Sequence, residues 1–239
     1  MRVFWGALST SVSPRGLVDS YVVNAYAMKL SKDVKDKVYF LKTWVGIGVE
    51  ETYQEATKKS FAFANDARPL HKYDLLYFPA LYKHHWFVLV VDLNDKSFVF
   101  LDSIYGEEDN FYKEVPDLMI PRFIHAWTNF GYTGVDFWDF KVKYPVVPKQ
   151  TNNRDCGIFA MKCMELWNPR VQMKDLIRPQ DIHNIRKQIA RDLLLSKHNS
   201  TRESIELVYN FNETKHGLYA GQARPFLGIC PMKLCFHFF

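Results

Sequence analysis

The chain has few of the features that mark an exported or membrane-bound protein. Its 239 residues include only four cysteines, and their spacing matches neither a disulfide framework nor a zinc site: Cys156, Cys163, Cys230 and Cys235. No basic segment followed by an apolar run opens the chain, and no apolar run is long enough to cross a bilayer. We therefore expect an intracellular protein, nuclear or cytoplasmic, without a metal and away from membranes.

A strong excess of charge of one sign is also lacking. The formal net charge is +5, and no block of lysines and arginines indicates a dedicated nucleic-acid surface. A modest positive charge suits docking to an acidic protein surface as well as weak contact with nucleic acid. Internal repeats and low-complexity tracts are absent as well.

Residues that can form a packed core are plentiful. Hydrophobic residues make up 48% of the sequence and aromatic residues 16%. A chain of this length can bury roughly 70% of the surface that it exposes when unfolded. We therefore expect one domain, with room for an accessory lobe.

The stretch from Gln150 to Phe159 is the most informative part of the sequence. A polar, turn-prone loop ends in an Asp-Cys-Gly step at Cys156, and an apolar run, Ile158–Trp167, follows until Pro169. This pattern predicts a buried helix with Cys156 in its first turn. Unpaired backbone N–H groups and the positive end of the helix dipole would then stabilise a thiolate, which makes Cys156 a candidate nucleophile. An ordinary buried cysteine is the alternative.

A β-hairpin signal lies upstream of this cysteine. Trp86–Leu93 and Ser97–Leu101 are rich in aromatic and β-branched residues, and the turn-forming residues Asn94–Lys96 separate them. His85 precedes the first strand and Asp102 follows the second. In an antiparallel pair these two positions become neighbours, so the carboxylate can orient the imidazole and support its charged form.

Each of these residues also has a simpler interpretation. The two histidines could be surface residues at a strand entrance, and Asp102 could merely cap a turn. A register shift of one residue would make His84 the candidate base, but we favour His85 because Trp86 follows it directly. Gln150 completes the set, because a neutral amide donor near a nucleophile can bind an oxyanion; otherwise it is a solvated loop residue.

At these residues the sequence resembles the Ulp1-like proteases of ubiquitin-like proteins, the SUMO-protease clan of cysteine peptidases. The matching features, in family order, are Asp74–Pro79, His85-Trp86, Asp102-Ser103, Gln150 six residues before Cys156, and Asp155-Cys156-Gly157. Leu17–Tyr26 also resembles the first helix of the family. The resemblance spans roughly Leu17 to Leu195.

The resemblance implies an α+β fold of the papain-like, Ulp1 type. In this fold helices flank a mixed central sheet, and the nucleophile lies at the N-terminus of a buried helix. A catalytic domain is expected over residues 17–218. A loop segment over residues 1–16 would precede it, and a tail of unknown role over residues 219–239 would follow.

The resemblance also assigns roles to the candidate residues. Cys156 would be the nucleophile, His85 the general base and then acid, Asp102 the orienting carboxylate and Gln150 the oxyanion donor. The substrate-binding residues would be Trp86, Leu17, Asp155 and Gly157, with Trp86 as the flat wall for a Gly-Gly terminus. Leu17 stands where the family usually has a second tryptophan, which leaves a smaller roof over the substrate channel.

The implied activity is cleavage after the C-terminal glycine of a ubiquitin-like protein, SUMO above all, by a monomeric enzyme that uses no cofactor. Three alternatives stay open. The same residues could transfer an acyl group to an amine or hydroxyl. The domain could bind a ubiquitin-like protein without cleaving it, or it could be a relic of a mobile element.

Periodicity predicts the remaining elements. A loop is expected over Leu8–Gly16, and Tyr39–Trp44 fits either a helix or a strand. Further strands are expected at Asp74–Phe78 and at Phe137–Val147, the latter leading to Gln150. Helices are expected at Leu17–Leu30, Thr52–Asn65, Arg122–Phe130 and Asp181–Leu195, the last with Arg186, Lys187 and Arg191 on its solvent side.

Overall fold

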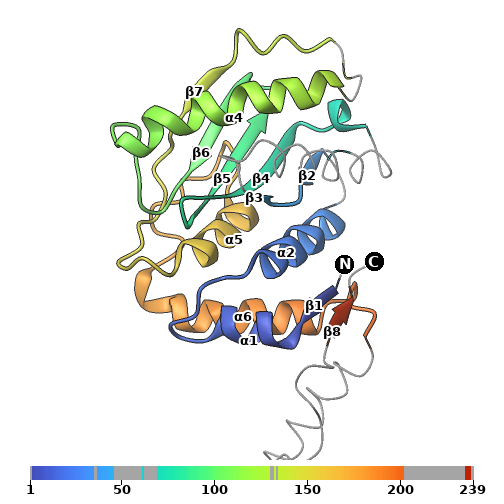
Figure 1. Cartoon of the computed structure of the whole chain (residues 1–239), viewed down its shortest axis with the longest axis vertical. Helices are drawn as coiled ribbons and strands as arrows, with labels where there is room; N and C mark the ends of the chain where they lie inside the picture. The colour runs from blue at the N-terminus through green and yellow to red at the C-terminus, as the bar shows by residue number, and fades with distance from the viewer. Residues whose placement is uncertain are drawn as a thin grey trace, which may run out of the picture.

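A mixed β-sheet forms the centre of the protein (Figure 1). The computed structural model describes residues 2–34, 37–45, 61, 69–129, 132, 134–201 and 235–237. The strand order is β2-β4-β5-β6-β7, and β3 also pairs with β4. The strands are β2 (Val38–Phe40), β3 (Trp44–Val45), β4 (Leu75–Tyr82), β5 (His85–Asp92), β6 (Ser97–Leu101) and β7 (Lys141–Lys143). β4, β5 and β6 are antiparallel neighbours, whereas β2, β3 and β7 pair in parallel.

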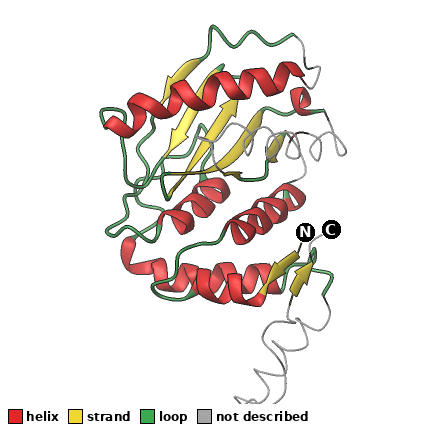
Figure 2. Ribbon diagram, in the orientation of Figure 1, coloured by secondary structure: helices red, strands yellow, loops and turns green. Residues whose placement is uncertain are grey.

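Helices cover both faces of this sheet (Figures 1 and 2). α4 (Asn110–Asn129) lies on one face, α5 (Cys156–Leu166) and α2 (Ser20–Asp33) lie on the other, and α6 (Ile182–Leu194) and α1 (Trp5–Val12) form a further layer. Two 3-10 turns, Leu70–Lys72 and Pro179–Asp181, and a small antiparallel pair of β1 (Arg2–Phe4) with β8 (Cys235–His237) complete the described elements. This is the expected α+β class. Within the described residues, no helix combines the length and apolar character needed to cross a membrane.

The β5–β6 hairpin divides the interior into two cores. Val88 and Val90 face the helices α2, α5 and α6, whereas Phe87, Leu89 and Val91 face α4. Side chains alternate along a strand, so a strand covered on both faces must be apolar along its middle, and in β5 the polar residues His85 and Asp92 stand only at the two ends. All eight residues of β5 are accordingly buried. The predicted hairpin is confirmed, and it is a rigid element that carries the residues at its open end.

α4 is longer than the sequence predicted, because it continues through Pro116 and Pro121. Each proline removes one backbone hydrogen bond and normally bends or ends a helix. Here the helix is retained by its buried stripe at three- and four-residue spacing, Tyr112, Val115, Met119, Phe123 and Trp127. Packing of this stripe against the sheet outweighs the two local defects.

The expected loop over Leu8–Gly16 is wrong for its first half, which belongs to α1. Leu8 is buried in the core and α1 packs against α6, so tertiary contact stabilises a segment with weak local helix signals. The next helix, α2, begins at Ser20 rather than Leu17. Asp19 is its N-cap, with a side-chain oxygen that accepts a hydrogen bond from the Tyr21 N–H at 2.8 Å.

The strand expected over Phe137–Val147 forms only at Lys141–Lys143. Pro145 and Pro148 lack the N–H that a strand ladder needs, so the chain continues to Gln150 without pairing. The ambiguous segment at Tyr39–Trp44 contributes to β2 and β3. The predicted helix at Thr52–Asn65, apart from Phe61, and the tail, apart from residues 235–237, lie outside the described residues.

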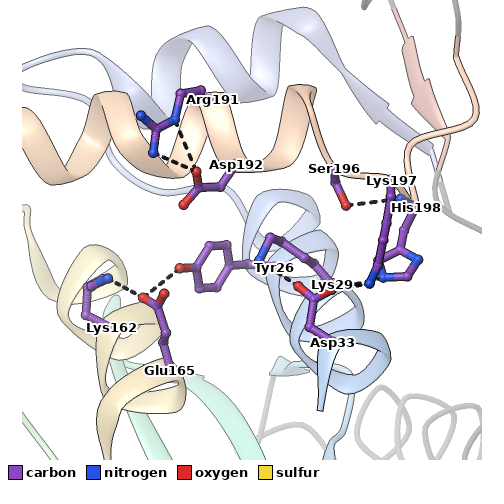
Figure 3. A network of polar contacts seen from close by, with 10 residues as sticks. All are labelled: Tyr26, Lys29, Asp33, Lys162, Glu165, Arg191, Asp192, Ser196, Lys197 and His198. Carbon is purple, nitrogen blue, oxygen red and sulfur yellow. Dashed lines mark hydrogen bonds and ion pairs between the residues drawn. The ribbon is translucent and has the colours of Figure 1, made fainter. Parts of the chain in front are cut away.

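Polar contacts join α2 to the two helices beside it (Figure 3). The Tyr26 hydroxyl of α2 donates to Glu165 of α5 at 2.9 Å. At the other end of α2, Asp33 lies 3.1 Å from the His198 ring, just after α6, and accepts from Lys29 at 2.8 Å. The first contact joins α2 to α5, and the second joins α2 to the segment after α6.

Candidate active site

Cys156 is the first residue of α5, as the sequence predicts. The backbone carbonyl of Asp155 accepts the N–H groups of Ile158 and Phe159 at 2.9 and 3.0 Å, which starts the helical hydrogen bonding directly at the cysteine. Among the described residues, no side chain caps this helix. The N–H groups of its first turn are therefore available to stabilise negative charge at or near the sulfur.

The Asp155 carboxylate is turned away from the helix start and held from two sides. Arg186 of α6 donates to one oxygen and Asn152 to the other, each at 2.6 Å. Arg186 also donates to the backbone carbonyl of Ser11 in α1. This contact network attaches the loop before Cys156 to α6 and α1.

The prediction that Arg186 lies on the solvent side of its helix is wrong, because Arg186 is fully buried. It lies four residues after Ile182 and three before Ile189, so it belongs to the buried stripe of α6 rather than to the charged face with Lys187 and Arg191. This helical spacing by itself could have indicated that Arg186 faces the core. A buried guanidinium needs a paired carboxylate, and Asp155 provides it.

The hairpin brings His85 and Asp102 together, as predicted. His85 Nε2 lies 2.9 Å from each oxygen of the Asp102 carboxylate, and both side chains are buried. Asp102 also accepts the backbone N–H groups of Ile104 and Tyr105 at 2.7 and 2.9 Å, and the Tyr112 hydroxyl at 2.9 Å. The carboxylate is thus held in one orientation toward the imidazole. His84 has positive φ in the turn before β5 and is exposed.

Cys156 also interacts with the imidazole of His85. Burial by itself would lower the pKa of His85, but Asp102 and Cys156 together raise it to about 9. His85 Nδ1 forms no hydrogen bond that meets ordinary geometric limits with a described residue, so the thiol–imidazole contact is loose. Nucleophile–base pairs are often looser before substrate binds. Cys156, His85 and Asp102 therefore meet at one place.

Aromatic rings enclose the imidazole of His85. Tyr105 and Phe111 meet it edge-on, with ring centroids 5.1 and 5.6 Å away, and Phe87 stacks at 6.3 Å. These rings exclude water from one side of His85 and restrict its rotation. The low local dielectric strengthens its electrostatic contact with Asp102.

The segment around Leu17 reaches the start of α5. The indole N–H of Trp86 donates to the Val18 carbonyl at 3.2 Å, and a Cβ on Gly157 would lie only 2.5 Å from Val18 Cβ. Glycine at 157 is therefore needed for this close approach. Leu17 is 63% exposed beside it, whereas Trp86 is only 4% exposed. The roles of Trp86, Leu17, Asp155 and Gly157 in substrate binding stay predictions.

Gln150 lies in the loop before α5, where it is hydrogen-bonded to Ser103, the residue after Asp102. Its side-chain oxygen accepts the Ser103 hydroxyl at 2.5 Å, and its backbone N–H donates to the Ser103 carbonyl at 2.9 Å. Its amide group donates to the Asn152 carbonyl. An amide NH₂ has two hydrogens, so one can still serve an oxyanion, and that role stays a prediction.

Three further residues of the site were missed from the sequence. They are Arg186, Tyr112 and Lys149, whose ammonium group donates to the carbonyls of Asp102, Ile104 and Tyr105 at 2.8–3.2 Å. Tyr112 and Lys149 have no local signal, because they meet Asp102 only through the fold. The part of the chain that the structure describes contains no group of three metal-ligating side chains that could hold an ion.

Comparison with known proteins identifies the family. Residues 17–198 match the sequence model of the family described as "Ulp1 protease family, C-terminal catalytic domain". This chain belongs to the Ulp1 protease family. The match covers the helix α2, the central sheet, α5 and α6, and it therefore includes every residue of the candidate site except Ser11.

Individual relatives within the Ulp1 family are distant in sequence. Sentrin-specific protease 5 of Homo sapiens and of Macaca fascicularis are each 24% identical over 187 residues, which is 74% of this chain and 22% of theirs. The chain thus spans about a fifth of the length of these curated relatives. The Ulp1 protease domain in complex with Smt3, the yeast ortholog of SUMO, matches with a TM-score of 0.63 at 15% identity, covering 79% of this chain and 81% of that one.

A second solved structure, described as a de-sumoylating protease, covers 90% of both chains with a TM-score of 0.58 at 16% identity. At such low identity these structural similarities establish the fold. The family fold predicted from the sequence is therefore confirmed.

Proposed function

We propose that this chain is a cysteine peptidase that cleaves after the C-terminal glycine of a ubiquitin-like protein, with SUMO as the first candidate. The observation that carries the proposal is the meeting of Cys156, at the start of α5, with the His85–Asp102 pair. Family membership supports the reaction class. Sentrin-specific relatives and a relative bound to a SUMO ortholog support the substrate.

The geometry supports a two-step acyl transfer. The Cys156 thiolate attacks the carbonyl carbon of the terminal glycine, and the backbone N–H groups at the start of α5, with Gln150, stabilise the oxyanion. His85 donates a proton to the nitrogen as the C–N bond breaks, which releases an amine and leaves a thioester on Cys156. Water then attacks the thioester, His85 accepts its proton, and the carboxylic acid leaves as the Cys156 thiolate re-forms.

The surroundings of Cys156 suit a substrate with a narrow terminus. Val18, Trp86 and Gly157 are in close contact beside the nucleophile, and Leu17 is exposed at this position. Residues without side chains, such as a Gly-Gly pair, would fit where larger residues would collide. Either a lysine-linked conjugate or a peptide extension can provide the leaving amine.

Hydrolysis of a fluorogenic SUMO C-terminal amide, beside the matching ubiquitin substrate, tests the proposal. We expect Cys156→Ala to reduce kcat/KM for the SUMO substrate by at least about 10⁴-fold, since the nucleophile is removed. Cys163→Ala is the matched control: it lies on the same helix, but burial, followed by the Asp102 charge, raises the pKa of its thiol to about 12.

The proposal fails if Cys156→Ala retains wild-type turnover, or if the wild-type chain cleaves neither substrate. A Gly-Gly vinyl sulfone probe on SUMO separates the alternatives. Binding of SUMO without labelling of Cys156 would indicate a binding module, whereas acyl transfer to an added amine would indicate a transferase. Monomeric action and a nuclear or cytoplasmic location are part of the same proposal.

A further inference from the structure

The two oxygens of the Asp102 carboxylate are held in different ways. Oδ1 accepts the N–H groups of Ile104 and Tyr105, which belong to the loop directly after Asp102. Oδ2 accepts the hydroxyl of Tyr112, which comes from the first turn of α4. His85 Nε2 is equally close to both oxygens. One oxygen is thus fixed locally, and the other depends on a different secondary-structure element.

The loop that holds Oδ1 is stabilised independently of α4. Lys149 donates to the carbonyls of Asp102, Ile104 and Tyr105 at 3.1, 3.2 and 2.8 Å, which keeps the loop closed. The Oδ1 contacts should therefore persist when Tyr112 is changed. Within the described residues, Tyr112 is the only group besides His85 that forms a hydrogen bond with Oδ2.

Tyr112 is built into the site as a permanent donor. Its ring is buried among those of Phe87, Phe100, Phe111 and Tyr144, with centroid distances of 5.0–6.2 Å. Burial, and then the Asp102 charge, raise the pKa of its hydroxyl well above the usual value. The hydroxyl therefore stays protonated over the whole working range of pH and always donates a hydrogen bond to Asp102.

We propose that Tyr112 is a positioning residue of the catalytic pair. Its hydroxyl holds the Asp102 carboxylate in place against His85, and its hydrogen bond partly neutralises the negative charge of that carboxylate. The Tyr112 hydroxyl is hydrogen-bonded to Asp102, so it acts on the reaction through that carboxylate. Its removal should leave substrate binding unchanged and alter the basicity of His85.

The sign of the effect follows from the charges around His85. The Asp102 carboxylate and Cys156 raise the pKa of His85. The Lys149 ammonium group donates a hydrogen bond to the Asp102 backbone carbonyl. Tyr105 and Phe111 contact the imidazole with their uncharged rings. A donor that draws charge from Asp102 weakens its attraction for the imidazolium proton. Loss of the Tyr112 hydroxyl should therefore raise the pKa of His85, and a stronger donor at the same place should lower it.

Two substitutions at position 112 test both directions. Tyr112→Phe removes the hydroxyl, and 3-fluorotyrosine at the same position keeps the ring and makes the hydroxyl a stronger donor. His85 is titrated by NMR on ¹⁵N-histidine-labelled full-length chain, which needs no substrate. We expect its pKa to rise by roughly 0.5–1 unit in Tyr112→Phe and to fall in the fluorotyrosine protein.

Tyr77→Phe is the matched control. Its buried hydroxyl donates to the Trp167 carbonyl at 2.7 Å, at the far end of α5, so it reproduces the loss of one buried hydrogen bond. We expect Tyr77→Phe to lower thermal stability without moving the His85 titration.

In turnover assays, Tyr112→Phe should lower kcat about 3- to 10-fold with KM within about twofold of wild type.

Opposite shifts in the two position-112 proteins support the proposal. An unchanged His85 titration in both proteins overturns it, as does an equal shift in Tyr77→Phe. If Tyr112→Phe does not fold, the fluorotyrosine protein still decides. The inference about kcat rests on the proposed function, but the titration does not. Absent turnover with opposite shifts would reject the peptidase assignment alone.

Discussion

Cys156 and Cys163 lie on one helix, yet their environments give the two thiols different chemistry. Cys163 is fully buried, and burial together with Asp102 raises its pKa to about 12, so it stays a neutral thiol. Cys156 lies beside the imidazole of His85, at a helix start whose first-turn N–H groups are not capped by any side chain of the described residues. Position in the helix, rather than residue type, therefore decides which cysteine can act as a nucleophile.

The raised pKa of His85 predicts the basic limb of the pH–rate profile. An imidazolium is needed to protonate the departing amine, and Asp102 and Cys156 hold the pKa of His85 at about 9 although burial opposes them. We therefore expect kcat/KM to be maintained through neutral pH and to fall with a midpoint near pH 9. Initial-rate assays from roughly pH 6 to pH 11 measure this pH–rate profile.

Asp102→Asn provides the comparison for this profile. It removes the charge and leaves burial, which lowers the pKa of His85, so the basic limb should move to lower pH. A wild-type limb near the ordinary histidine value of about 6.5 would show that Asp102 and Cys156 do not stabilise the imidazolium.

At the scale of elements, the approach of the Leu17–Asp19 segment to α5 shapes the site. Val18 occupies the space that a side chain at Gly157 would need, with 2.5 Å from an added Cβ to Val18 Cβ. The Val18 carbonyl is also fixed by the indole of Trp86. The segment before α2 is therefore held against the start of α5 by packing and by a hydrogen bond.

Gly157→Ala should force this segment and α5 apart. We expect the free energy of unfolding to fall by roughly 1–3 kcal/mol, which is typical of overpacking. Because the displaced atoms adjoin Cys156, the loss of kcat/KM, expressed as a free energy, should be larger than the loss of stability. Thermal or denaturant unfolding and turnover of the SUMO substrate measure the two effects.

Gly6→Ala is the control for this change. An added Cβ at Gly6, in α1, would have no neighbour within 4 Å in the part of the chain that the structure describes. Alanine there should stabilise the helix by up to about 1 kcal/mol. If Gly157→Ala behaved like Gly6→Ala in both assays, the close packing of Val18 against α5 would be refuted.

At the scale of the whole molecule, Arg186 joins three helices that are far apart in sequence. It binds Asp155 before α5 and the Ser11 carbonyl in α1, which are 31 and 175 residues away along the chain. Because the charge is fully buried, removal of one partner would leave the other uncompensated. The loop before Cys156 is thereby positioned by the outer layer of helices.

Arg186→Met should destabilise the protein by about 3–5 kcal/mol, since it leaves the Asp155 carboxylate buried without its cation. Arg191→Met, on the exposed face of the same helix, removes an ion pair with a 64% exposed arginine side chain and should cost less than about 1 kcal/mol. Adding Asp155→Asn to Arg186→Met should restore part of the lost stability. Urea unfolding of the four proteins measures this; equal effects of Arg186→Met and Arg191→Met would contradict the prediction.

The sequence by itself determined the features that depend on neighbouring residues. The hairpin that joins His85 to Asp102, the helix that begins at Cys156 and the order of the site residues follow from strand and helix periodicity and from turn residues, all of which act over a few positions. The match to the family pattern adds the fold.

Only the tertiary structure decided the features that depend on distant contacts. α4 continues through two prolines because the sheet holds its apolar face, and the same packing brings Tyr112 to Asp102. Arg186 is buried because Asp155 of another element neutralises it. Helical spacing can place Arg186 on the buried face of α6, but such contacts join residues with no fixed separation along the chain, so no local pattern names the partners that complete the site.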